Sequence, residues 1–201
     1  MVYSWKTFFY RLIIDPLVKS IRISLMSFVK PGDRVIEIAC GTGVLSLAMA
    51  HKAGHVTGID LSEEMIATAR RSAVSRKIGN IRFELLDASR LSGIPDNSFD
   101  KAVTSLSMHQ FDRDVALKVI SEMRRIAQRI IIADYNSPMH KGPARSLAEA
   151  IEWMAGGDHY RNFRYFMKNN GIAGLAKEAG LRVIDVRITG RGVFTVAELA
   201  V

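Results

Sequence analysis

Val35-Ile36-Glu37-Ile38-Ala39-Cys40-Gly41-Thr42-Gly43-Val44-Leu45 is an apolar run, then two closely spaced glycines, then the start of a second apolar segment. The first run is typical of a buried strand, and residues 44–51 have helical spacing. Gly41 and Gly43 let the backbone approach a ligand closely, while the start of the following helix offers free N–H groups. The stretch therefore predicts a strand, a glycine turn and a helix that together bind a nucleotide-like ligand.

The glycine turn alone leaves the identity of that ligand open, because the dinucleotide-binding pattern Gly-x-Gly-x-x-Gly is similar. Ser46 stands where the third glycine of that pattern would be. A nicotinamide-dependent (NAD) oxidoreductase therefore remains an alternative, although this position departs from its pattern.

Short runs rich in Val and Ile alternate with longer segments of helical spacing, as in a parallel α/β sheet. Seven strands are predicted, at residues 34–39, 55–60, 81–86, 99–105, 129–134, 182–187 and 193–199. Helices are expected to fill the intervals, including one from residue 63 to about 76 that Ser62 caps and one from residue 112 to about 128. The interval between the last two strands suits only a hairpin, so the final strand is expected to be antiparallel.

Two aspartates follow the second and third predicted strands. Asp60 ends the second strand, where a carboxylate can accept hydrogen bonds from both hydroxyls of an adenosine ribose. Asp87 ends the third strand, where an acid can accept a hydrogen bond from an adenine amino group. Either aspartate alone could instead cap a helix or form a turn. The glycine turn and both acids together favour a ligand that contains adenosine.

At these residues the chain resembles class I S-adenosylmethionine-dependent methyltransferases, in particular the small enzymes of ubiquinone and menaquinone biosynthesis. The resemblance covers roughly residues 29–201. It rests on four segments in order, which are residues 35–43, Gly58-Ile59-Asp60-Leu61-Ser62 with Met65, Leu86-Asp87-Ala88, and Phe99-Asp100-Lys101-Ala102-Val103. It implies a three-layer, Rossmann-like α/β fold with seven mostly parallel strands, an antiparallel final strand and helices on both faces. It also implies S-adenosylmethionine as the cofactor.

The resemblance further implies which residues hold the cofactor. It places Glu37, Ala39, Gly41 and Gly43 around the methionine part, Asp60 at the ribose, Leu61 and Met65 along the adenine, and Asp87 with Ala88 at the adenine edge. Thr42 in the turn and Ser105 at the end of the fourth strand are further candidates for cofactor binding. Cys40 is expected to pack in the turn, because a nucleophilic thiol needs a base partner and the sequence suggests none near Cys40.

Methyl transfer depends mainly on aligning the two reacting atoms and excluding water. An amine or phenol acceptor must also lose a proton, which a side chain of near-neutral pKa can receive. His109 follows the fourth predicted strand by a few residues and is the candidate for this catalytic role. The alternative is a histidine that only bonds a lid or contacts the cofactor.

Residues 135–180 contain about two helices more than a single crossover needs, at the carboxyl side of a strand, where open α/β sheets bind ligands. This insertion is predicted to form the substrate site, with His159 and Tyr160 as contacts and Tyr10 closing over it. Each of the three could instead pack or lie on the surface. No metal site is predicted, because the ends of the fourth and fifth strands supply two oxygen ligands at most.

Residues 1–30 carry apolar and aromatic residues at roughly helical spacing, interrupted at Pro16, with five basic residues and one acidic residue. They predict one or two amphipathic helices that pack over the sheet, form a lid or rest on a membrane surface. The net charge of +8 favours acidic partners, but the basic residues form no continuous run, so a nucleic-acid partner is disfavoured. A cofactor-fold adaptor that binds a membrane or nucleic acid without turnover is the alternative function.

A length of 201 residues suits one domain, residues 1–201. The single cysteine excludes an internal disulfide and suits a reducing compartment, so a cytoplasmic location is expected. The longest stretch without charge, residues 38–51, falls short of the roughly 20 residues of a membrane-spanning helix. The prediction is a methyltransferase that acts on a small, hydrophobic molecule at oxygen, nitrogen or carbon, as a monomer or homodimer, with peripheral membrane contact left open.

Overall fold

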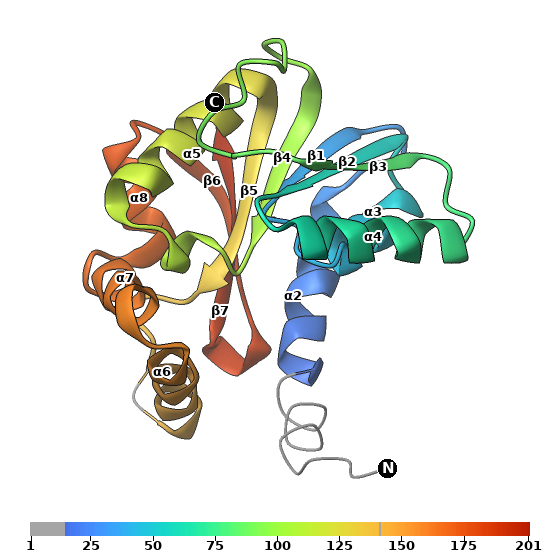
Figure 1. Cartoon of the computed structure of the whole chain (residues 1–201). Coiled ribbons are helices and arrows are strands. Elements are labelled where there is room, and N and C mark those ends of the chain that lie inside the picture. Colours follow the sequence, from blue (N-terminus) through green and yellow to red (C-terminus); the bar gives the residue numbers. More distant parts are fainter. Residues whose placement is uncertain (1–14, 141) are drawn as a thin grey trace, which may run out of the picture.

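The strands form where the sequence shows short, β-branched apolar runs. The computed structural model describes residues 15–140 and 142–201, and side chains from residue 19 on, residue 141 excepted. Its strands are β1 Arg34–Ile38, β2 His55–Asp60, β3 Ile81–Leu85, β4 Phe99–Ser105, β5 Ala127–Tyr135, β6 Arg182–Thr189 and β7 Phe194–Ala200. They form one sheet in the order β3-β2-β1-β4-β5-β7-β6 (Figure 1). The central strands β1, β4 and β5 are buried on both faces over most of their length, which explains the apolar runs that they contain.

The final strand is antiparallel, as expected, and it lies inside the sheet. β7 pairs antiparallel with β5 on one side and with β6 on the other. The remaining neighbours, from β3 to β5, pair in parallel. A short 3-10 turn, η3 Gly190–Gly192, joins β6 to β7 and provides the tight reversal that the short interval predicted.

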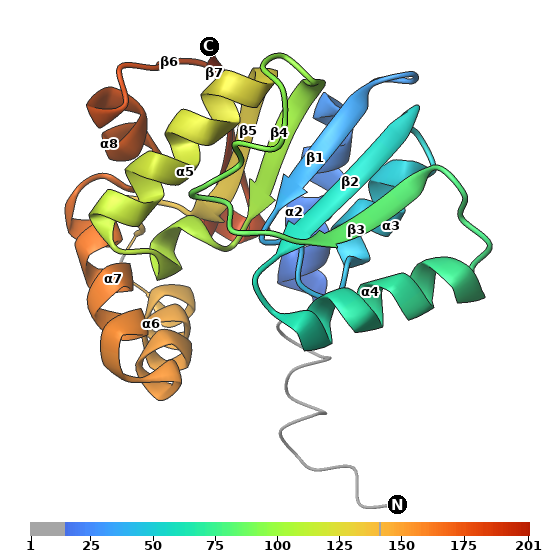
Figure 2. The same ribbon diagram turned by 45° about the horizontal axis from the view of Figure 1, so that its top comes forward.

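Helices cover both faces of the sheet and give three layers (Figures 1 and 2). On one face lie α2 Asp15–Phe28, α3 Val44–Ala50 and α4 Glu63–Ser75, and on the other lie α5 Arg113–Ile126 and α8 Gly171–Glu178. The side chain of Ser62 caps α4 by accepting a hydrogen bond from the Met65 amide at 3.3 Å, as predicted. The α/β fold predicted from the sequence, with its antiparallel final strand, is therefore confirmed.

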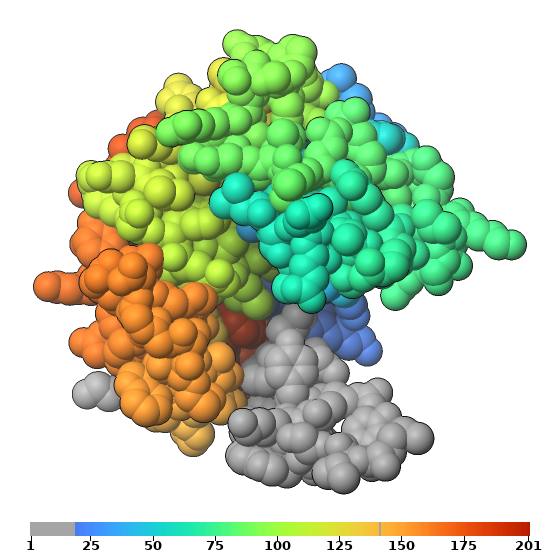
Figure 3. Space-filling view, viewed as in Figure 1, coloured from blue at the N-terminus to red at the C-terminus, as the bar shows by residue number. Residues whose placement is uncertain are grey.

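The predicted insertion forms helices beyond the carboxyl end of β5. α6 Pro143–Ala155 and α7 Gly157–Lys168 project past the sheet, and α8 returns the chain to β6. The short helix η2 Met108–Gln110, which follows β4, packs against α7. In the space-filling view, the orange surface of α6 and α7 stands opposite the teal surface of α4 (Figure 3). The two extra helices therefore flank the sheet edge at which the glycine turn lies.

Two expected helices differ from the structure. Residues 86–98, all of them described, contain no helix between β3 and β4. The helix expected to reach residue 128 ends at Ile126, and β5 begins at the next residue because Ala127 is already extended at φ −136°. Strand formation wins there because residues 127–135 pair with both β4 and β7.

Pro16 does not break a helix in the described part of the N-terminal segment. It lies in the first turn of α2, where the N–H that proline lacks would have no helical partner. Ile21, Leu25 and Phe28 of α2 are buried, and the helix contacts the strands of the sheet. α2 thus takes the sheet-packing option left open by the sequence, while Tyr10 and the lid expected around it lie outside the described residues.

Leu25→Ala is expected to lower the free energy of unfolding by about 2 to 4 kcal/mol, because it opens a cavity beneath a core helix. The Leu25 side chain is 1% exposed, whereas Ile23 on the same helix is 62% exposed. Ile23→Ala is therefore the matched control and should change stability by about 0.5 kcal/mol or less. Urea denaturation measures both, and equal losses would show that α2 does not pack on the sheet as described.

Candidate functional site

The glycine turn follows β1 with several residues at positive φ. Ala39, Gly41 and Gly43 have φ of 55°, 54° and 76°. The turn is tied to β2 by the Cys40 amide, which donates to the Ile59 carbonyl at 2.9 Å. A Cβ placed on Gly41 would meet nothing within 4 Å, so the backbone here faces open space. The Gly41 position is therefore a cradle that a side chain would fill and a ligand can approach.

Gly43 is a glycine for a different reason. A Cβ at this position would lie 2.6 Å from the Cζ atom of Phe83, which is buried on β3. Gly58 of β2 has the same constraint, because its Cβ would lie 2.6 Å from the Phe83 ring. Both glycines make room for this ring between α3, α4 and the sheet, so Gly43 shapes the turn by permitting close packing.

Asp60 joins the end of β2 to the glycine turn. Its Oδ2 atom accepts a hydrogen bond from the Gly41 amide at 2.8 Å, and its Oδ1 atom accepts one from the Ser62 amide at 2.9 Å. A carboxylate offers about four lone-pair sites, so each oxygen retains capacity for another donor. The two amides fix the half-buried carboxylate beside the open space at Gly41.

Exposed apolar side chains flank this carboxylate. Leu61 is 69% exposed and Met65 is 38% exposed, although both are large and hydrophobic. Leu61 directly follows Asp60 in the chain, and Met65 lies in the first turn of α4. Thr42, in the glycine turn, is also exposed. The surface thus offers an apolar wall beside a fixed carboxylate, which suits a ligand with an aromatic base and a sugar.

Glu37 lies under the turn as a buried acid. It is 3% exposed, and its Oε2 atom accepts a short hydrogen bond from the Ser46 hydroxyl. Burial raises the pKa of Glu37 to about 8. Burial also raises the pKa of the Cys40 thiol, which packs in the cluster around Phe83 as a small apolar group. Ser46, which replaces the third glycine of the dinucleotide pattern, therefore serves as the partner of Glu37.

Asp87 forms a turn after β3 and keeps part of its carboxylate available. Its Oδ1 atom accepts hydrogen bonds from the amide and hydroxyl of Ser89 at 2.9 and 2.8 Å. These bonds lower the pKa of Asp87. The amide of Leu86 donates to the Asp60 carbonyl at 3.1 Å, so the two acidic strand ends are adjacent. Ala88 and Ser105 are half-buried at the ends of their segments.

His109 lies in a buried network of polar groups after β4. It is 2% exposed, and its Nδ1 atom lies 2.6 Å from Oδ1 of Asp134. Its Nε2 atom lies 3.5 Å from Oε1 of Glu152 on α6. Glu152 also accepts a hydrogen bond from the Tyr135 hydroxyl at 2.7 Å and lies 2.5 Å from Nε2 of His159 on α7. The network joins η2, β5, α6 and α7.

Opposite charges in this network shift the pKa values of His109 and Glu152 in opposite directions. Burial alone would lower the pKa of His109, but the Asp134 and Glu152 carboxylates outweigh it and raise the pKa to about 9. Burial alone would raise the pKa of Glu152, but hydrogen bonds from His109 and Tyr135 outweigh it and lower the pKa to about 2. Two buried carboxylates therefore face an imidazole whose two nitrogens are both engaged.

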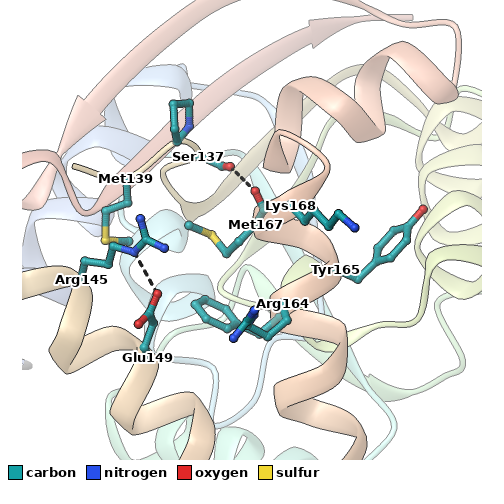
Figure 4. Close-up of a pocket in the computed structure, with 10 residues that line it drawn as sticks. Ser137, Met139, Arg145, Glu149, Arg164, Tyr165, Met167 and Lys168 are labelled. Carbon is teal, nitrogen blue, oxygen red and sulfur yellow. Dashed lines mark hydrogen bonds and ion pairs between the residues drawn. The ribbon is translucent and has the colours of Figure 1, made fainter. Parts of the chain in front are cut away.

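A cavity of about 510 Å³ opens between α6, α7 and the segment after β5 (Figure 4). Its apolar lining includes Met139, Phe163 and Met167, and its polar lining includes Arg164 and Lys168. Of the predicted substrate contacts that the structure describes, His159 and Tyr160 do not line this cavity. His159 bonds Glu152, and the Tyr160 hydroxyl accepts a hydrogen bond from Arg164 at 3.3 Å.

The sequence did not indicate Glu152 or Tyr135 as members of a site. The burial of Glu152 depends on its contacts with His109 of η2 and Tyr135 of β5. Asp134 lies at the end of the fifth predicted strand, where the sequence offers it as an oxygen ligand. Its observed partners are instead the Nδ1 atom and amide of His109 and the amide of Tyr135.

The sequence of this chain is similar to those of known methyltransferases. The model of a methyltransferase domain matches residues 35–129, which include β1 to β4, the glycine turn and both acids. The ubiquinone/menaquinone biosynthesis C-methyltransferase UbiE of Teredinibacter turnerae is 31% identical over 63% of this chain and 52% of its own length. The ubiquinone biosynthesis O-methyltransferase of Neisseria meningitidis is 29% identical over 78% of this chain and 66% of its own length. The chain thus spans about half to two thirds of these curated relatives.

Solved structures show the same fold. Magnesium protoporphyrin IX methyltransferase from Synechocystis, solved with S-adenosylmethionine bound, superposes with a TM-score of 0.68 at 17% identity, over all of this chain and 85% of that one. A methyltransferase from Aquifex aeolicus superposes with a TM-score of 0.64 at 21% identity, over 90% and 89% of the two chains. Among the described residues, no helix has the length and apolar character that crossing a membrane requires. The chain thus matches a methyltransferase domain over residues 35–129, is similar in sequence to ubiquinone biosynthesis methyltransferases, and shares the fold of S-adenosylmethionine-dependent methyltransferases.

Proposed function

We propose that the protein transfers a methyl group from S-adenosylmethionine to a small, predominantly hydrophobic molecule. The observation that carries the proposal is the hydrogen bond of 2.8 Å between the Gly41 amide and Asp60, which holds an acid beside the open space at Gly41. The exposed Leu61 and Met65 beside it supply an apolar surface for a base. These features fit an adenosine-containing cofactor and extend the expectation drawn from the sequence.

The chain's residues have separate roles in this proposal. Asp60 accepts hydrogen bonds from the ribose hydroxyls, Leu61 and Met65 line the adenine, and Asp87 with Ala88 lies at the adenine edge. The turn around Gly41, with Glu37, Ala39, Thr42, Gly43 and Ser105, surrounds the methionine part. When bound, S-adenosylmethionine supplies an electrophilic methyl group on a sulfonium. The residues that hold it act by orientation and by keeping water away from the reacting atoms.

His109 stays a candidate for the catalytic base, but its geometry favours a positioning role. Both imidazole nitrogens face carboxylate oxygens, at 2.6 and 3.5 Å, and the residue is 2% exposed. An imidazole in this setting has no open side toward an acceptor molecule. We therefore assign it the task of holding α6 and α7 against the end of β4, with orientation as the main source of catalysis.

The acceptor is proposed to bind among the helices that follow β5. The cavity there is lined by the apolar side chains of Met139, Phe163 and Met167, by the cationic side chains of Arg164 and Lys168, and by the ion pair of Arg145 and Glu149 (Figure 4). This lining suits a molecule with an apolar body and a polar or anionic group. His159 and Tyr160, which do not line the cavity, and Tyr10, which lies outside the described residues, remain proposed as contacts for any part of the acceptor that extends beyond the cavity. The cytoplasm, with its reducing conditions, remains the proposed location.

Asp60→Ala is expected to weaken S-adenosylmethionine binding by about 1 to 3 kcal/mol, or roughly 5- to 150-fold, because buried ribose hydroxyls lose a charged acceptor. Isothermal titration calorimetry with S-adenosylmethionine, S-adenosylhomocysteine and NAD measures this. The wild-type protein should bind the first two and not NAD.

Asp185→Ala, on the edge strand β6, is the control and should bind the cofactor as the wild type does. Unchanged affinity in Asp60→Ala would refute the ribose role, and binding of NAD alone would refute the proposed function. Formation of S-adenosylhomocysteine in the presence of phenol and amine acceptors then measures transfer itself. Bound cofactor with no turnover on any acceptor, together with pelleting on anionic vesicles, would favour a non-catalytic adaptor.

A further inference from the structure

Three side chains from separate elements converge with the spacing of metal ligands. They are His109 on η2, Glu152 on α6 and His159 on α7, and their candidate ligand atoms all lie within 4.8 Å of one another. Two imidazole nitrogens and one carboxylate oxygen form the donor set of many transition-metal sites. From this arrangement we propose that His109, Glu152 and His159 bind a zinc ion.

The orientation of His109 supports the proposal. Its Nδ1 atom faces Asp134 at 2.6 Å, which leaves Nε2 directed toward Glu152. Asp134 is itself fixed, because it accepts hydrogen bonds from the amides of His109 at 3.1 Å and Tyr135 at 2.7 Å. Histidines that bind metals commonly donate their other N–H to a carboxylate, which sets the tautomer and the direction of the ring. The supporting carboxylate of such a site is therefore already built.

Glu152 has a comparable support. Its Oε1 atom accepts a hydrogen bond from the buried Tyr135 hydroxyl at 2.7 Å, while Oε2 faces His159. Zinc bonds of about 2.0 to 2.2 Å in a tetrahedral arrangement separate the ligand atoms by about 3.4 Å. The spacing of 3.5 Å between His109 Nε2 and Glu152 Oε1 meets this value directly. The Nε2 atom of His159 lies only 2.5 Å from Oε2 of Glu152, so the His159 side chain must move outward to admit the ion.

His159 is the ligand best able to make that movement. Its side chain is 30% exposed, whereas those of His109 and Glu152 are 3% and 6% exposed. The accessible side of the cluster is thus an entry path, and three protein ligands leave a fourth position for water. Nitrogen donors favour zinc over magnesium or calcium, which prefer oxygen ligands. The ion would tie η2, at the end of β4, to both helices of the insertion.

The same residues form hydrogen bonds without a metal, so the experiment must distinguish the two states. Protein without an affinity tag is freed of metal and titrated with Co²⁺, whose visible absorbance reports its coordination as a substitute for Zn²⁺. We expect one equivalent to bind with the intense spectrum of a four-coordinate ion, and Zn²⁺ to displace it. Free Zn²⁺ at about 100-fold above its Kd should raise the Tm by roughly 5 to 10 °C.

His159→Ala and Glu152→Gln should each abolish the cobalt spectrum and the zinc-dependent rise in Tm. His159→Ala removes the exposed ligand, so it is the variant best expected to fold, and its Tm without metal checks this. His140→Ala is the control, because His140 is exposed and lies outside the cluster. A wild-type protein that takes up no Co²⁺ overturns the proposal, as does a spectrum that His159→Ala leaves intact.

Discussion

Gly43→Ala is expected to lower the free energy of unfolding by about 2 to 5 kcal/mol. An L-residue at φ 76° adopts an unfavourable left-handed conformation, and the new Cβ would lie 2.6 Å from the Phe83 ring. The backbone cost is of order 1 to 2 kcal/mol, and overpacking of a buried ring adds about 1 to 3 kcal/mol. Urea denaturation of the variant and of the wild type measures the difference.

Two other glycines separate these contributions. Gly41→Ala carries the backbone cost alone, since its Cβ would meet nothing within 4 Å, and should weaken cofactor binding more than folding. Gly79→Ala should be nearly neutral, because Gly79 has neither a positive φ nor a close neighbour. Phe83→Leu in the Gly43→Ala background should recover part of the loss, and strict additivity of the two changes would contradict the steric explanation.

Glu37 should make the folded state less stable as the pH rises from about 4.5 to 8. Burial raises the pKa of Glu37 to about 8 from its ordinary value of 4.5, so the native state binds the proton more tightly than the unfolded state. Stability from this group is therefore fully present below the unfolded pKa and is lost as pH rises through the folded pKa. The loss is at most about 5 kcal/mol at 1.36 kcal/mol per pH unit.

Glu37→Gln should remove this slope, because an amide keeps an oxygen acceptor for the Ser46 hydroxyl and does not titrate. The measurement is the free energy of unfolding in urea at several pH values, and the difference between the two proteins isolates Glu37 from other titrating groups. Glu63→Gln, at an exposed position in the first turn of α4, is the control and should retain the wild-type slope. Parallel curves for Glu37→Gln and the wild type would contradict the raised pKa.

The fold and the glycine turn could be predicted because their signals are local. Strand alternation, the capping of α4 by Ser62 and the acids ending β2 and β3 each depend on a few neighbouring residues. The physical role of Gly43 could not be predicted, because Phe83, which demands a glycine there, lies 40 positions further along the chain. The sequence indicates that a glycine is present and does not distinguish ligand approach from close packing.

The polar network was beyond sequence reasoning for a related reason. Glu152 and His159 reach His109 only because α6 and α7 fold back onto η2, and nothing near any of the three indicates that contact. A histidine after β4 therefore suggested proton transfer, whereas its partners are the two carboxylates that enclose it. The role of a residue at the end of a strand therefore depends on which side chains of α6 and α7 contact it.

The placement of β7 between β5 and β6 has a consequence for biosynthesis. Within the described chain, β6 pairs with β7 alone, so residues 182–189 have no sheet neighbour until residues 194–200 have left the ribosome. Until then β5 is an edge strand, and the sheet is completed when the hairpin of β6 and β7 pairs with it. A ribosome stalled shortly before residue 194 would carry a sheet of five strands, in which the unpaired backbone groups of β5 can pair with another chain.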